Sequence, residues 1–165
     1  MIFELRQTER AEALFEGWKE TILWSCLQGV MGRIYVDSLE KPASALALLG
    51  DFCFLAGKPD RELVMHEPKE DRREFRILIP GDRAWADLIE ACYGERAKKI
   101  TRYAIKKEPE VFDREKLQKA LDGLPEGCTL QMMDEALFLR CREIGWCRDW
   151  VAQYDTYEQY QRYGL

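Results

Sequence analysis

The stretch GRIYVDSLEKPASALALLGDFCFLAGKPD, residues 32–60, decides the fold because it holds three apolar runs separated by short polar breaks. RIYV at 33–36 is rich in β-forming residues and ends at a turn signal. The second run spans 43–49, and the glycine and aspartate at 50–51 predict a two-residue hairpin turn. The third run, 52–56, lacks polar alternation and should be covered on both faces. These runs predict a three-stranded antiparallel meander whose third strand is buried deepest.

Helical and strand-like segments alternate along the rest of the chain. Apolar residues at three- and four-residue steps predict a helix over 9–28, which Gly17 weakens or splits. Further strands are expected at 75–80, 97–107 and 128–132. We therefore expect an α/β (α+β) fold in a single domain, residues 1–165, with a mixed, largely antiparallel sheet flanked by helices.

Aspartate or threonine caps predict the later helices. A short helix is expected within 59–67, and longer ones after Asp82, Asp113 and Asp134. Thr156 and Gln159 form a capping box for the last helix. In the helix after Asp113, the inward side chains are expected to be Leu117, Ala120, Leu121 and Leu124.

Composition excludes several classes of protein. The 165 residues are 47% hydrophobic and 33% charged, with a net charge of -5, which is typical of a globular protein rather than of a nucleic-acid binder. No apolar run approaches the roughly 18 residues of a membrane span. The acidic N-terminal sequence differs from a signal peptide. We expect a cytoplasmic protein that binds neither nucleic acid nor membrane.

The six cysteines and the sole histidine predict neither a metal site nor a thiol active site. Structural zinc sites use closely spaced pairs, and the chain has no C-x-x-C. We therefore expect buried or half-buried thiols. His66 has charged neighbours, which favours an exposed surface position over a role as general base.

The tail WCRDWVAQYDTYEQYQRYGL, residues 146–165, is the most functional-looking segment. Trp146, Trp150 and Tyr154 are spaced i, i+4 and i+8, which fits a helical packing stripe, a surface that docks another domain or chain, or an aromatic substrate pocket. Asp37 ends a strand, either as a binding carboxylate or as a turn aspartate that bonds its own backbone. These four residues are the candidates for substrate or partner binding.

No catalytic residue can be assigned. The basic run KKITRYAIKK at 98–107 fits a solvated strand face. Considered by itself, it could also bind a phosphate or another anionic ligand. The sequence has no G-x-G-x-x-G, no Walker loop and no nucleophile elbow.

Four motifs resemble the zwittermicin A resistance-type branch of the GNAT acetyltransferases. They are GRIYVD at 32–37, PASAL at 42–46, FCFLAG at 52–57 and TYEQYQRYGL at 156–165. The resemblance implies a two-lobe family protein whose C-terminal lobe binds acetyl-CoA through a Q/R-x-x-G-x-G/A loop. That loop is absent from this sequence.

The resemblance therefore implies that this chain is the N-terminal lobe only, cut short before the acetyl-CoA lobe. It would help to form the acceptor-amine side of an N-acetyltransferase, be inactive alone and bind no cofactor by itself. Its expected partners are the C-terminal lobe or a second copy, with a small-molecule amine as acceptor, and the exposed tail face predicts a dimer. The alternative is a stand-alone, non-catalytic ligand- or protein-binding module.

Overall fold

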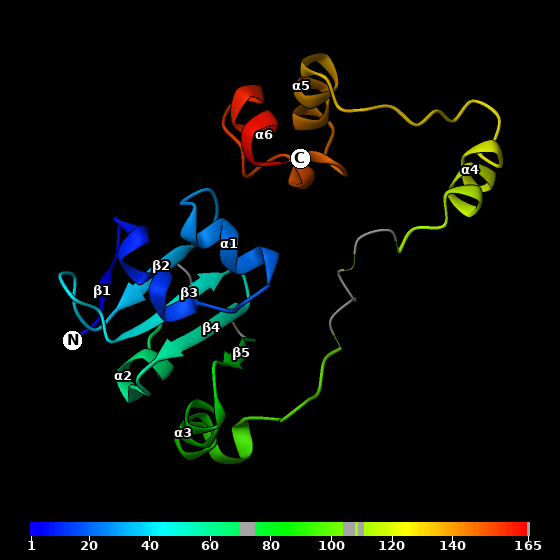
Figure 1. The fold of residues 1–165 in the computed structure, drawn as a ribbon. Helices are drawn as coiled ribbons and strands as arrows, with labels where there is room; N and C mark the ends of the chain where they lie inside the picture. Colours follow the sequence, from blue (N-terminus) through cyan, green and yellow to red (C-terminus); the bar gives the residue numbers. More distant parts are fainter. Residues whose placement is uncertain (70–74, 104–107, 109–110, 165) are drawn as a thin grey trace. The chain divides into compact units, whose positions relative to one another are not determined.

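The computed structural model describes residues 1–69, 75–103, 108 and 111–164. The chain divides into two compact units, Met1–Lys98 and Lys99–Leu165, and Figure 1 labels the α-helices and strands within them.

The described part of the first unit contains one five-stranded sheet. Its strands follow each other in chain order: β1 (Phe3–Glu4), β2 (Arg33–Val36), β3 (Ser44–Leu49), β4 (Phe52–Gly57) and β5 (Ile77–Pro80). All neighbours are antiparallel except β4 and β5, which are parallel. Leu49 pairs with Phe52 across the two-residue turn, where Gly50 has a φ of +56°. The predicted meander is confirmed.

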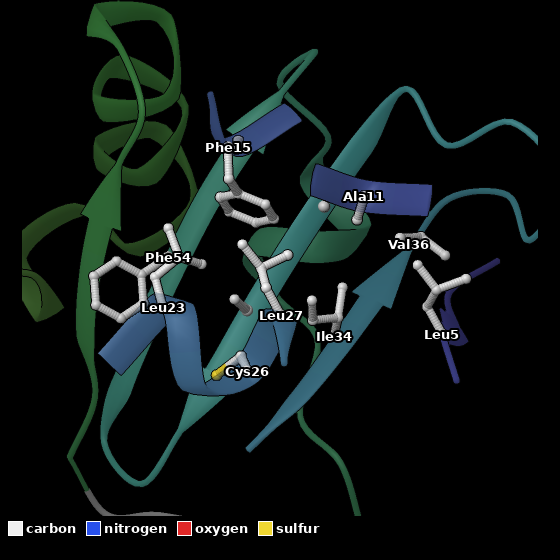
Figure 2. Packing of buried hydrophobic residues seen from close by; sticks show 12 residues of the cluster. Leu5, Ala11, Phe15, Leu23, Cys26, Leu27, Ile34, Val36 and Phe54 are labelled. Carbon is white, nitrogen blue, oxygen red and sulfur yellow. The ribbon is translucent and has the colours of Figure 1, made fainter. Parts of the chain in front are cut away.

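Helices cover both faces of this sheet. On one face, η1 (Thr8–Phe15) and α1 (Thr21–Leu27) pack a core that includes Ile34 and Phe54 (Figure 2). On the other face, α2 (Arg61–Val64) and α3 (Arg83–Tyr93) pack against Leu46 and Leu55. Successive strand residues point to opposite faces, so β4 contributes to both cores and is buried on both sides as predicted. The α/β fold class is confirmed.

The N-terminal helix is interrupted rather than continuous. Gly17 has a φ of +84°, a left-handed conformation that an α-helix does not contain, so the segment expected at 9–28 splits into η1 and α1. The helix after Asp82 matches its prediction, since the Asp82 carboxylate accepts a hydrogen bond from the Trp85 amide and the helix ends at Gly94. The short 3-10 helix η2 (Gly94–Arg96) follows.

The described part of the second unit consists of short helices joined by irregular segments. Its elements are α4 (Arg114–Asp122), α5 (Glu135–Glu143), the 3-10 helix η3 (Arg148–Trp150) and α6 (Tyr157–Tyr163). The strand expected at 128–132 is wrong, and so is the strand at 97–107 as far as 103, while 104–107 lie outside the described residues. Isolated β-forming residues do not make a strand without a partner to complete its hydrogen bonds.

The inward face expected for α4 is also wrong. Leu117, Leu121 and Leu124 are exposed, and Ala120 is exposed with them. Helical spacing fixes which side chains share a face, whereas burial requires another element to cover that face.

Candidate functional site

Two exposed indoles lie together in the second unit. The ring centroids of Trp146 and Trp150 are 5.2 Å apart in an edge-to-face arrangement, and the residues are 75% and 61% exposed. Exposed tryptophans supply large, rigid contact areas at protein interfaces. This Trp146–Trp150 pair is an exposed aromatic surface of the second unit.

The helical stripe expected for Trp146, Trp150 and Tyr154 is wrong. Helix α5 ends at Glu143, Ile144 has extended backbone angles, and the following residues form turns and η3. The two indoles therefore face solvent, whereas Tyr154 is buried.

Tyr154 belongs to a small aromatic core. Its ring meets that of Tyr160 edge-to-face at 5.5 Å, and Tyr160 also packs against Phe138 at 5.7 Å. Arg142 Nη1 donates to the carbonyl oxygens of Tyr154 and Asp155, at 2.9 and 2.8 Å. These contacts join α5 to the segment before α6, so Tyr154 stabilises the unit rather than lining its surface.

Asp37 closes the loop between β2 and β3. Its Oδ1 accepts hydrogen bonds from the backbone amides of Ala43 and Ser44, at 2.9 and 3.1 Å. The Ser44 hydroxyl in turn donates to the Lys58 carbonyl at 2.5 Å. This geometry is that of a loop-closing aspartate, and the carboxylate keeps its second oxygen for other contacts.

His66 is half-buried, which contradicts the exposed position expected from its charged neighbours. Its ring packs on Tyr35 with centroids 4.5 Å apart, and its carbonyl accepts a hydrogen bond from Arg76 Nη1 at 2.6 Å. Burial first, and the charge of Arg76 second, lower the pKa of His66. The sequence analysis did not identify Arg76 as a candidate. The one feature that could have indicated it is an arginine at the start of an apolar strand.

The cysteines are free thiols in varied settings. Cys26, Cys53, Cys141 and Cys147 are buried and Cys92 is half-buried, as expected, but Cys128 is exposed. Burial raises the pKa of Cys26 to about 11, so this thiol is not a nucleophile at neutral pH. Within the described ranges, no group of histidine, cysteine and acidic side chains is arranged to hold a metal ion.

Aspartate side chains occupy the N-termini of α2, α3, α4 and α5, where a phosphate would otherwise bind, whereas α1 begins without a side-chain cap and α6 is capped by Thr156. The Asp82, Asp113 and Asp134 carboxylates accept from backbone amides in the first turns of α3, α4 and α5, at 2.9, 3.1 and 2.8 Å. Asp60 does the same for α2. Free amides and the positive helix end attract phosphate, so a carboxylate there both fills the amides and repels the ligand. The aspartate-capped termini of α2, α3, α4 and α5 do not fit a pyrophosphate.

The basic run predicted at 98–107 does not form a binding site within the described residues. Residues 98–103 of the basic run are exposed and irregular, and 104–107 lie outside the described residues. Of the helices that the structure describes, none has the length and apolar character needed to cross a membrane.

Comparison with known proteins gives one consistent family. The family described as GNAT acetyltransferase matches residues 12–165. The crystal structure of a GCN5-related N-acetyltransferase-like protein from Streptococcus suis 89/1591 is similar, with a TM-score of 0.68 and 45% sequence identity. The similarity covers 94% of this chain but 62% of that one, so this chain spans less than two thirds of its length. No curated protein matches this sequence.

Proposed function

Because the chain belongs to the GNAT acetyltransferase family, we propose that it forms one lobe of an acetyl-CoA-dependent N-acetyltransferase and helps to shape the acceptor-amine side of the active site. The family match over residues 12–165 carries this proposal. Identity of 45% over nearly the whole chain supports it further, because it extends through both compact units.

We place the chain in the zwittermicin A resistance-type branch, as its N-terminal half. The supporting motifs are GRIYVD at 32–37, PASAL at 42–46 and FCFLAG at 52–57, which form the meander of β2, β3 and β4. Asp37 ends the first of them and could meet a polar substrate through its second carboxylate oxygen.

Acetyl-CoA binding is assigned to residues outside this chain. The family generally uses acetyl-CoA, which supplies the acetyl group when bound. Aspartates cap α2, α3, α4 and α5, and these capped termini do not fit the cofactor's pyrophosphate. We therefore propose that the chain is inactive alone, and we derive no catalytic step from its residues.

The Trp146–Trp150 pair is the proposed contact for a partner, either the acetyl-CoA lobe or a second copy of this chain. Both indoles are exposed, and an uncovered aromatic pair favours association. We expect a dimer in light scattering, converted to a monomer by Trp146→Ala with Trp150→Ala. A wild-type monomer at high protein concentration would contradict the partner assignment.

The free thiols support a reducing compartment, so we propose a cytoplasmic location.

Two assays test the enzymatic assignment. Sequencing the gene downstream of residue 165 should reveal an in-frame continuation with an R/Q-x-x-G-x-G/A loop. The longer product should release free CoA from acetyl-CoA when amines are supplied, and the 165-residue chain should not. Turnover by the 165-residue chain would refute the one-lobe proposal.

The alternative function is a stand-alone, non-catalytic module that binds a ligand or protein. The exposed Trp146–Trp150 pair favours it, because that surface needs no catalytic lobe to bind a partner. A stop codon directly after residue 165, together with a partner lost on Trp150→Ala, would select this alternative.

A further inference from the structure

Arg76, just before β5 in the first unit, has a hydrogen-bonding edge that no described group occupies. Its Nη1 donates to the His66 carbonyl at 2.6 Å. Its Nε and Nη2 are closed to solvent and have no partner within the described residues. In a guanidinium group these two nitrogens direct one N–H each to the same side, which presents two parallel donors.

His66 adds a third buried polar atom to this place. Its Nε2 is closed to solvent and, in the part of the chain that the structure describes, has no partner either. The imidazole packs on Tyr35 and lies near enough to Arg76 for the guanidinium charge to act on it. Tyr93 lies close as well, and its hydroxyl donates to the Val64 carbonyl at 3.1 Å.

The described carboxylates do not neutralise Arg76. The charge of Glu67 reaches this cluster, since it helps to raise the pKa of Tyr93 after the larger effect of burial. Glu67 is nevertheless exposed, and neither Nε nor Nη2 of Arg76 bonds to it. Buried charged donors are normally paired, because leaving them without an acceptor is costly.

We propose that Arg76 and His66 form a binding site for an oxyanion, the carboxylate or phosphate group of a small molecule, held by Nε and Nη2 of the guanidinium. Two oxygens of such a group match the two parallel donors, which is the geometry that makes arginine the preferred residue for these anions. The site lies on the sheet face covered by α2 and α3 and does not depend on the acetyltransferase assignment. Since the donors are closed to solvent, the side chains over them must shift when the anion enters.

His66 is the sole histidine, so its imidazole signal in NMR reports directly on this site. The wild-type chain is titrated with inorganic phosphate, with acetate and with chloride at matched ionic strength. A bound oxyanion should shift the His66 signal saturably and raise its pKa, because nearby negative charge favours the imidazolium. Saturation by phosphate alone identifies a phosphate site, and saturation by acetate alone identifies a carboxylate site.

Arg76→Lys keeps the charge but removes the parallel donors. It should weaken oxyanion binding roughly tenfold or more. The matched control is Arg83→Lys, at an exposed arginine of the same unit that pairs with Asp87, and it should bind like the wild type. If Arg76→Lys fails to fold, the titration of the wild-type chain still shows whether the site binds an oxyanion.

Two results would overturn the proposal. One is a shift of the His66 signal that never saturates or is equal for all three anions, because ionic strength alone would then explain the shift. The other concerns Glu70, Asp71 and Glu74, which lie outside the described residues. If replacing these carboxylates with amides creates oxyanion binding that the wild type lacks, the chain itself supplies the partner of Arg76.

Discussion

Replacing Gly32 with alanine should destabilise the first unit far more than the same change at Gly29, three residues earlier in the same loop. Both glycines have left-handed backbones, with φ of +78° and +68°. A Cβ at Gly32 would lie 2.5 Å from the Leu48 carbonyl oxygen and 2.6 Å from Cys26 Sγ. A Cβ at Gly29 would meet no described heavy atom within 4 Å.

The loss of stability has two contributions, the strain of an L-residue with a left-handed backbone and the crowding of the added Cβ, and the two variants separate them. An L-residue in this backbone region costs about 1 kcal/mol, which both variants share. Gly32→Ala also forces the β3 backbone or the buried Cys26 to move, and overpacking of this kind costs about 2 kcal/mol more. For a unit of this size, that difference corresponds to roughly 8–16 °C in the melting temperature.

Urea and thermal unfolding followed by far-UV circular dichroism measure both variants against the wild type. The free energy of unfolding should fall by about 1 kcal/mol for Gly29→Ala and about 3 kcal/mol for Gly32→Ala. Equal losses for the two variants would refute the close approach of Gly32 to β3.

Three further predictions concern single side chains. Asp37→Ala should lower the free energy of unfolding by about 1–2 kcal/mol, and Asp37→Asn by less because it keeps an acceptor oxygen, as measured by urea unfolding. At about pH 8, iodoacetamide should label exposed Cys128 but not Cys26, whose pKa burial raises to about 11, as read by peptide mass mapping; labelling of both in the folded chain would contradict this. The pKa of His66 is lowered in the folded chain, so the unfolded chain binds this proton more readily and stability should fall as the pH drops below about 6.5. His66→Gln should lose that part of the pH dependence, and an unchanged pH profile would count against it.

The meander of β2, β3 and β4 could be predicted because its strands and turns are adjacent in the sequence, whereas the short strand β1 was not predicted. The apolar runs at 33–36, 43–49 and 52–56 and the turn at 50–51 fix both pairing and register. The second unit was less predictable. The expected strand at 128–132 and the buried face of α4 depend on partners that a periodic pattern does not reveal.

The sequence identified the candidate site residues, but it did not predict their burial or the side chains around them. The four-residue spacing of Trp146 and Trp150 is consistent with their contact, but the pattern did not reveal that α5 ends before them, that both indoles are exposed and that Tyr154 is buried. His66 was expected at the surface because its sequence neighbours are charged, yet Tyr35 and Arg76 cover it from other elements. Such contacts are long-range, and no residue pattern near position 66 encodes them.

Isothermal titration of the 165-residue chain with acetyl-CoA tests the central claim most directly. The claim is that this GNAT family chain supplies one lobe and leaves cofactor binding to residues outside it. The aspartate caps of α2, α3, α4 and α5 predict no measurable heat of binding at micromolar concentrations. Micromolar, one-to-one binding of acetyl-CoA to this chain would contradict the claim.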